Sequence, residues 1–241
     1  MIVLISPISP EEALGILDCG VDIIDVKNVD EGSLGAQFPW RTREVVDLCG
    51  RRGICVSATL GDLPFKPGTA SLAAYGVASL GVGYVKAGLH GMNTYEEAFE
   101  MMDAIRRSVR MVSETAAVVA SGYADYRRFD GLNPLDLVQA AKDAVCDVVM
   151  VDTAIKDGKG LFDNLSMQEL HAFVGAAKNA GLKVALAGSI GREDADCLFE
   201  LDPHIIGVRG AVCAGVDRKT AISPTKTHEF VRFFHQTDAT G

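Results

Sequence analysis

The amino-acid sequence predicts an α/β protein with the (β/α)8 TIM-barrel architecture, formed by a single domain that spans residues 1–241. Short β-branched runs alternate with longer segments of helical periodicity from one end of the chain to the other, a pattern typical of a parallel sheet. A length of 241 residues also suits a one-domain barrel, because such barrels contain about 250 residues. The alternative is a doubly wound sheet, but no G-x-G-x-x-G turn follows the first strand and no G-x-x-x-x-G-K-[ST] motif occurs.

The predicted strands are short apolar runs, each bounded by turn-forming or polar residues. They are Ile2–Ile5, Asp22–Val26, Ile54–Ala58, Tyr84–Ala87, Thr115–Ala120, Asp147–Val151, Lys183–Ala187 and Ile205–Val208. One helix is predicted after each strand. These helices are Pro10–Cys19, Arg41–Cys49, Thr69–Leu80, Thr94–Ser108, Pro134–Ala144, Ser166–Asn179, Arg192–Glu200 and Thr225–His235.

Several of these helices carry a recognisable start signal. Ser9 precedes Pro10, Asn133 precedes Pro134, and Ser166 has Glu169 three residues later. A polar side chain before the first turn accepts a backbone N–H, and proline suits the first helical position.

The net charge of −9 disfavours nucleic acid or an anionic membrane as the main partner, since both require a basic surface. The apolar N-terminus lacks the basic region and the length of a signal peptide, and no run of 18 apolar residues is present. We therefore expect a cytoplasmic protein that acts on a small molecule. Self-association into a homo-oligomer is compatible with the sequence, and the tail 236–241 is expected to fray.

The cysteine and histidine patterns do not indicate a metal site. The six cysteines are scattered without a C-x-x-C pair, and the five histidines form no H-E-x-x-H or similar ligand spacing. We interpret the cysteines as reduced thiols, mostly in the core, and we expect neither a metal nor another cofactor.

Charged side chains stand where a strand should carry apolar ones. Asp25 and Lys27 alternate onto the same strand face as Ile23, Lys86 ends the run that begins at Tyr84, and Asp152 follows Val151. An unpaired charge on a core-facing position costs several kcal/mol, so these residues are expected to have a partner, a ligand or a chemical task. They are predicted to converge on one pocket.

Lys27 and Lys86 lie on even-numbered strands, which share side-chain layers inside a barrel. A lysine near another cation, or one removed from water, has a lowered pKa and can act as a nucleophile or base. That favours Schiff-base chemistry on a carbonyl, with Asp25 and Asp152 orienting an ammonium or moving protons. The alternative is a buried salt-bridge network in which the two aspartates neutralise the lysines, and the two interpretations are compatible.

A phosphate site is predicted at the loops after the seventh and eighth strands. Gly188 and Ser189 follow one strand, and Arg209 and Gly210 follow the other. Small residues let backbone N–H groups approach an anion, a helix N-terminus adds a favourable dipole, and arginine can donate a forked pair of hydrogen bonds. The alternative is that these glycines merely form tight strand-to-helix turns, but two such loops at the expected places favour phosphate binding over it. Lys156 is a further candidate for phosphate binding, although most loop lysines are simply solvated.

Two long loops on the same side, Asn28 to Pro39 and Thr153 to Leu165, are candidates for lids. Hydroxyl groups at strand ends add possible substrate contacts, although ordinary polar strand ends explain them as well. They belong to Ser57, Thr59, Ser121 and Tyr123.

Four segments in order resemble one family. They are D-V-K-N ending at residue 28, Y-V-K-A-G-L at 84–89, V-M-V-D-T-A-I-K-D-G-K at 149–159 and G-V-R-G-A-V-C at 207–213. Together they are similar to (5-formylfuran-3-yl)methyl phosphate synthases, also called 4-(hydroxymethyl)-2-furancarboxaldehyde-phosphate synthases, over nearly the whole chain.

The resemblance implies condensation of two molecules of glyceraldehyde 3-phosphate to the furan precursor of methanofuran, with loss of phosphate and water. It implies that Lys27 is the Schiff-base lysine and Lys86 the proton acceptor, with Asp25, Asp152 and Lys156 as further site members. Less favoured are a phosphorylated-sugar isomerase or another class I aldolase-type barrel enzyme that makes no furan, and a non-catalytic sensor of a phosphorylated ligand.

Overall fold

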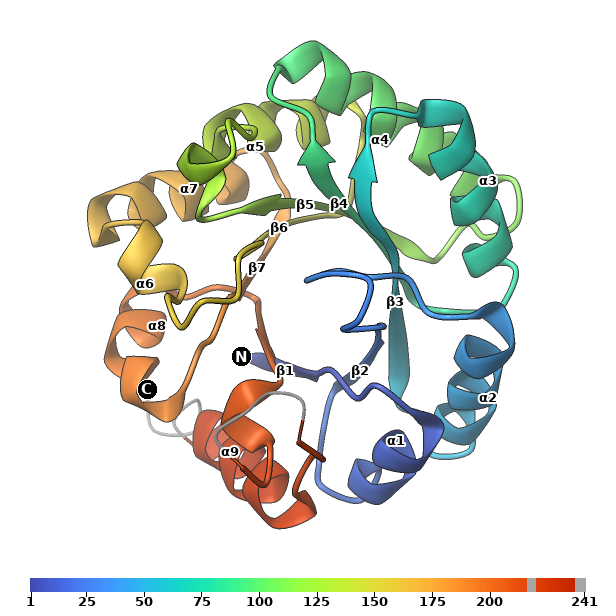
Figure 1. The fold of residues 1–241 in the computed structure, drawn as a ribbon, viewed down its shortest axis with the longest axis vertical. Coiled ribbons are helices and arrows are strands. Elements are labelled where there is room, and N and C mark those ends of the chain that lie inside the picture. The colour runs from blue at the N-terminus through green and yellow to red at the C-terminus, as the bar shows by residue number, and fades with distance from the viewer. Residues whose placement is uncertain (216–219, 237–241) are drawn as a thin grey trace.

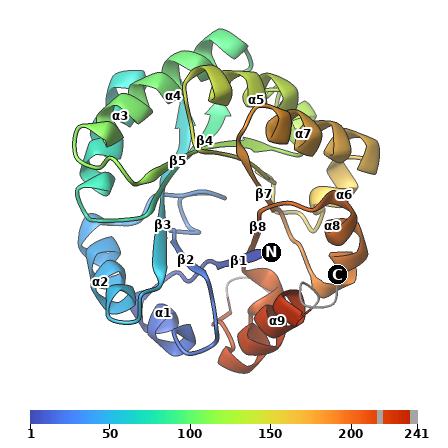
Figure 2. The same cartoon turned by 180° about the vertical axis from the view of Figure 1, so that it is seen from behind.

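The computed structural model describes residues 1–215 and 220–236. Eight parallel strands follow one another around a closed barrel, and β1 pairs with β8 to complete the ring. Figure 1 shows the strands as an inner ring with the helices outside it, and Figure 2 shows the same arrangement from behind. The predicted (β/α)8 barrel is confirmed.

The strands are β1 (Ile2–Ile5), β2 (Ile23–Val26), β3 (Cys55–Pro64), β4 (Tyr84–Gly91), β5 (Ala117–Tyr123), β6 (Val148–Asp152), β7 (Lys183–Ala187) and β8 (Ile205–Val208). The α-helices are α1 (Pro10–Ile16), α2 (Pro39–Gly50), α3 (Pro67–Ala78), α4 (Tyr95–Arg110), α5 (Pro134–Asp143), α6 (Leu161–Asn164), α7 (Met167–Asn179), α8 (Ala195–Leu201) and α9 (Pro224–Gln236). Short 3₁₀ turns are η1 (Tyr126–Arg128), η2 (Arg192–Asp194) and η3 (Gly210–Val212). Gln236 ends α9, so the rest of the tail predicted to fray lies outside the described residues.

Strands β3, β4 and β5 extend further at their carboxyl ends than the sequence predicts, β4 reaching Gly91 instead of Ala87. Gly61 and Gly122 suggest turns, yet the chain remains extended because it pairs with a neighbouring strand. In β3 this pairing passes Asp62 opposite Gly88 and reaches Pro64 opposite Gly91, with an irregularity in the register on each side of Asp62. The prediction that β3 ends at Ala58 was therefore wrong, since a cross-strand ladder leaves no local signal.

Two helix predictions also needed correction. Helix α6 was not predicted, and it begins where Asp163 accepts the backbone N–H of Gly160 at 2.7 Å. The helix predicted from Arg192 instead begins with η2, and α8 proper begins at Ala195. Other helix ends differ from their predicted positions by a few residues, which is the usual uncertainty at frayed termini.

The barrel interior changes from apolar to charged toward the carboxyl ends of the strands. Below these charged residues, an apolar cluster fills the barrel interior with side chains that include Leu4, Ile23, Val119 and Met150. Along β2 and just beyond it, the inward positions pass from Ile23 to Asp25 and then Lys27. A separate, larger cluster packs the outer face of the sheet against the helices. The fold thus places its buried charges at one end of an apolar core.

The described residues contain no helix that is both long and apolar enough to cross a membrane. None of the six cysteines, all of which lie within the described residues, forms a disulfide, and four of them are buried. The prediction of unpaired thiols, mostly in the core, is confirmed.

Candidate active site

A pocket of about 590 Å³ opens at the carboxyl ends of the strands. Its walls come from β1, β2, β4, β6, β7 and β8 and from the loops after β6, β7 and β8. The strand-end hydroxyl residues that the sequence suggests do not line this pocket; they are Ser57, Thr59, Ser121 and Tyr123. The nine other site residues that the sequence predicts all line it. They are Asp25, Lys27, Lys86, Asp152, Lys156, Gly188, Ser189, Arg209 and Gly210.

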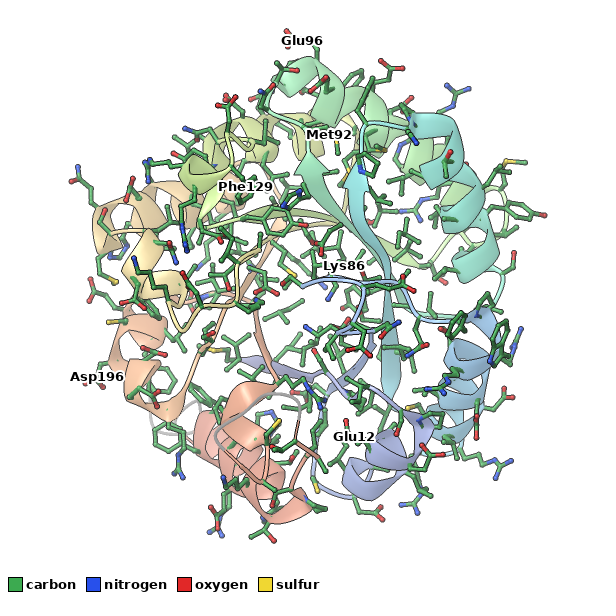
Figure 3. The ribbon with its side chains drawn as sticks, in the orientation of Figure 1. Glu12, Lys86, Met92, Glu96, Phe129 and Asp196 are labelled. Carbon is green, nitrogen blue, oxygen red and sulfur yellow. The ribbon has the colours of Figure 1, made fainter. Side chains whose placement is uncertain are left out.

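Lys86 and Asp25 form a buried ion pair in the middle of the barrel. The Lys86 ammonium donates to both carboxylate oxygens of Asp25, at 2.8 and 2.9 Å, and the Ser6 hydroxyl donates to Oδ2 at 3.0 Å. Figure 3 labels Lys86 near the centre of the ring. Burial would raise the pKa of Asp25, but Lys86 and then Lys27 outweigh it and hold that pKa below its ordinary value. The pair therefore carries an ionised carboxylate beside an ammonium.

Lys27 is buried in the same pocket but, unlike Lys86, its ammonium is not paired with a carboxylate among the described residues. It is 6% exposed, and within the described part of the chain it forms no hydrogen bond or salt bridge. Burial lowers the pKa of Lys27 to about 8, against the opposing attraction of Asp152 and Asp25. A neutral amine is the nucleophilic form, so burial favours nucleophilic reactivity at this position.

Asp152 and Lys156 form the second ion pair of the site. Lys156 Nζ donates to Asp152 Oδ1 at 2.9 Å and to Thr153 Oγ1 at 2.8 Å, while Thr153 N donates to the same Asp152 oxygen at 2.7 Å. Burial opposes ionisation of Asp152, but Lys156 and Lys27 hold its pKa well below the ordinary value. Lys156 thus folds back over the pocket mouth instead of pointing into solvent.

The loop after β7 turns through backbone conformations that glycine prefers. Gly188 has φ +109° and Ser189 has φ 54°. A Cβ at Gly188 would lie 3.0 Å from the Thr153 side chain, so glycine allows this loop to pack against the loop after β6. The expected helix-dipole contribution is small, because η2 and η3 contain only three residues each. Anion binding here would depend on individual backbone N–H groups.

The forked donor of Arg209 is directed toward a protein carboxylate. Arg209 is 5% exposed, and its two terminal nitrogens donate to the Glu12 carboxylate at 2.9 and 3.3 Å. It also donates to the Ser6 carbonyl at 2.8 Å. Figure 3 labels Glu12 in the region of α1. Arg209 therefore ties the end of β8 to β1 and α1 at the pocket wall.

The loop between β2 and α2 covers the other half of the barrel mouth. Ser33 Oγ donates to the Thr153 carbonyl at 2.8 Å, and Thr59 Oγ1 donates to the carbonyl of the fully buried Leu34. Leu34 N donates in turn to Asp62 at 3.2 Å. In Figure 1 this blue segment crosses the middle of the ring. The pocket accordingly lies toward β1, β2 and β6–β8.

Several residues of this environment were not predicted. The sequence analysis did not single out Glu12, Ser6, Thr153, Asp62 or Asp125 as site residues. Each acts by contacting a segment distant in sequence, so no local motif marks it. The described residues also contain no group of three or more His, Cys, Asp or Glu side chains that could hold a metal ion.

Comparisons with known proteins agree with the family resemblance. The model of the 4-HFC-P synthase family matches residues 3–231. A (5-formylfuran-3-yl)methyl phosphate synthase of Archaeoglobus fulgidus is 51% identical over 222 residues, covering 92% of this chain and 94% of that protein. A protein of the same name from Methanocaldococcus jannaschii is 51% identical over 218 residues, covering 90% and 92%.

Solved structures of low identity show the same fold. Deoxyribose phosphate aldolase from Aeropyrum pernix superposes with a TM-score of 0.65 at 16% identity, covering 98% of this chain and 89% of that one. Phosphoribosyl anthranilate isomerase from Thermus thermophilus gives 0.64 at 16% identity, covering 98% and 100%. These structural similarities show the barrel fold alone, whereas the family model and the relatives at about 50% identity show the protein family. The chain is thus an enzyme that belongs to the 4-HFC-P synthase family.

Proposed function

We propose that this enzyme condenses two molecules of glyceraldehyde 3-phosphate into (5-formylfuran-3-yl)methyl phosphate through a Schiff base on Lys27, as a step of methanofuran biosynthesis. The observation that carries the proposal is Lys27 itself, a buried amine without a hydrogen-bond partner among the described residues and with its pKa lowered to about 8. The names of the relatives at about 50% identity support the product. The reaction releases one phosphate and two waters, which balances the atoms of two trioses against one furan.

The covalent step begins with the ketone isomer of one triose phosphate. The neutral Lys27 amine attacks its carbonyl carbon, water leaves, and the resulting iminium acidifies the adjacent C–H bond. The Lys86 ammonium, in the same pocket, supplies the proton with which the hydroxyl of the carbinolamine leaves as water. The neutral Lys86 amine, held by Asp25, then accepts the proton of the adjacent C–H bond. The enamine attacks the aldehyde of the second triose phosphate.

The two phosphate groups require separate positive or N–H-rich positions. We assign one to backbone N–H groups in the loops that contain Gly188, Ser189 and Gly210, and the other to the Lys156 ammonium. Elimination of phosphate, ring closure and dehydration then complete an aromatic aldehyde. No step in this scheme transfers electrons to an external acceptor.

Borohydride reduction in the presence of glyceraldehyde 3-phosphate tests the covalent step. We expect an irreversible mass adduct on the peptide that contains Lys27, with loss of both adduct and turnover in Lys27→Ala. Lys183→Ala is the control, since Lys183 begins β7 at the opposite end of the barrel from the pocket. Product formation without any adduct, or near-normal turnover of Lys27→Ala, would contradict the Schiff base.

The same experiment separates the alternative functions. A non-furan isomerase would interconvert the triose phosphates without a six-carbon product, and an aldolase-type enzyme would give an adduct but no furan. Detection of the furan aldehyde by its ultraviolet absorbance distinguishes both from the proposed synthase.

A further inference from the structure

Asp125 is a buried carboxylate just beyond β5 that does not line the pocket. It is 2% exposed, and its carboxylate forms no salt bridge with the residues described. Both of its oxygens are used by the backbone of another loop. Oδ1 accepts the N–H of Ala154 at 2.8 Å, and Oδ2 accepts the N–H of Ile155 at 2.8 Å.

The two amides belong to the turn that carries Lys156. This turn begins at Asp152, whose carbonyl accepts the N–H of Ala124 at 2.7 Å. It ends where the Lys156 ammonium returns to Asp152 and Thr153. Because the lysine folds back on its own turn, the position of its ammonium depends on the backbone between residues 153 and 156.

An ionised carboxylate suits this task better than a neutral group of the same shape. It presents acceptors on both oxygens, whereas asparagine would place an NH₂ group against one of the two N–H groups. Hydrogen bonds to an ionised acceptor are also stronger than neutral ones. The sequence puts Asp125 31 positions from Lys156, so the connection exists only in the folded barrel.

We infer that Asp125 is a positioning residue that fixes the Lys156 ammonium over the pocket by holding the amides of Ala154 and Ile155. The inference rests on the proposed function, in which Lys156 binds a substrate phosphate. Asp125 touches no substrate, and it acts only through the turn.

A double-mutant cycle on steady-state kinetics with glyceraldehyde 3-phosphate tests this inference. For Asp125→Asn we expect kcat/KM to fall about 10²-fold, mainly through a higher KM, because displacement of a substrate-positioning group by about 1 Å has an effect of that size. In Lys156→Ala, kcat/KM should fall by at least the same factor. In the Lys156→Ala background, Asp125→Asn should have no further effect, since the group that it positions is absent.

The matched control is Asp147→Asn. The Asp147 carboxylate likewise accepts a backbone N–H from β5, that of Val118 at 2.7 Å, but at the opposite end of β6 from Lys156. This variant should leave KM within about twofold of the parent enzyme. If Asp125→Asn lowered kcat/KM by the same factor in the parent enzyme and in Lys156→Ala, the inference would be overturned, because Asp125 would then act independently of the lysine.

A readout that does not depend on turnover is the NMR signal of Lys156 in protein labelled with ¹³C at lysine Cε. The signal is assigned by its loss in Lys156→Ala. We expect Asp125→Asn to move it and Asp147→Asn to leave it in place. If Asp125→Asn fails to fold, Asp125→Ser retains one acceptor and serves in its place. An unmoved Lys156 signal would overturn the inference, whereas a moved signal in an enzyme that makes no furan would refute the proposed function alone.

Discussion

Lys27 is the residue whose environment differs most from that of an ordinary lysine. Its neighbours Asp25 and Asp152 each bond a different lysine, Lys86 and Lys156, so the two available carboxylates are already occupied. Water is largely excluded from the ammonium, and the attraction of the aspartates compensates only in part. A salt-bridge network thus holds Lys86 and Lys156, as one interpretation of the sequence expected, whereas the Lys27 ammonium forms no hydrogen bond among the described residues and stays the candidate nucleophile.

The reactivity of Lys27 should follow pH in a defined direction. Only the neutral amine attacks a carbonyl, so the rate of reductive trapping should rise with pH and level off above the pKa of about 8. A free lysine analogue, with an ordinary value near 10.4, should still be gaining rate at that point. Adduct mass measured at a series of pH values gives the midpoint. A midpoint close to that of the analogue would contradict the desolvated environment.

The same pKa predicts a stability effect. Lys27 has a pKa of about 8 in the folded chain and an ordinary pKa of about 10.5 in the unfolded chain. Burial of the ammonium therefore destabilises the fold, and the effect is fully present below pH 8. Lys27→Met should raise the free energy of unfolding at pH 7 by about 3 kcal/mol. The gain should shrink as pH rises from 8 to 10.5, because the parent lysine is then neutral. Urea denaturation at several pH values measures it, and a gain that is independent of pH would refute the assignment.

Among the elements, the covering loop between β2 and α2 is the most constrained by its backbone. Asn28 N donates to the Gly35 carbonyl at 2.9 Å, which closes the loop on itself. A Cβ at Gly35 would lie 2.1 Å from the Asn28 carbonyl oxygen, closer than any real contact. The loop can therefore keep this shape only with glycine at position 35.

Gly35→Ala should lower stability and open the covering loop. We expect faster cleavage within residues 28–38 during limited proteolysis and a higher KM, because the Ser33–Thr153 contact would be lost. Gly76→Ala is the matched control. Gly76 lies inside α3 with nothing within 4 Å of its Cβ position, so alanine should stabilise the protein by about 0.5–1 kcal/mol. Unchanged proteolysis of Gly35→Ala would contradict the closed loop.

Element prediction succeeded where the signal is local. The caps at Ser9, Asn133 and Ser166 are all formed as predicted, with side chains that accept a backbone N–H. It failed where a contact with another strand decides the structure, as at Asp62 in β3. A residue that looks like a turn former remains in a strand when its neighbour supplies the hydrogen bonds.

At the scale of the whole molecule, the barrel is closed by contacts between the two ends of the chain. Beyond the pairing of β1 with β8, the Glu12 carboxylate accepts from Arg209, from Ile8 N at 2.9 Å and from Ile222 N at 3.3 Å. Burial would raise the pKa of Glu12, but Arg209 and the backbone donors hold it below the ordinary value. This one side chain thus joins β1, β8 and the segment before α9.

Glu12→Gln should weaken this closure. A carboxylate whose pKa is lowered in the folded state stabilises the fold above its ordinary value of 4.5 and loses that contribution as pH falls through the folded value. We expect a loss of about 1–2 kcal/mol at pH 7, reduced by partial exposure, with the difference shrinking below pH 4.5. Thermal unfolding of parent and variant across this range measures it. A constant difference at all pH values would mean that shape, not charge, is responsible.

The sequence by itself determined the barrel, the inward positions of Asp25, Lys27, Lys86 and Asp152, and the meeting of these residues with the loops after β6, β7 and β8 at one pocket. These follow from a period of two along each strand and from the common edge at which parallel strands end. Only the tertiary structure decided which lysine pairs with which aspartate, that Arg209 bonds Glu12, and that Asp125 holds the Lys156 turn. Such choices depend on distances of a few ångströms between side chains from different strands, and these distances exist only after the barrel has closed.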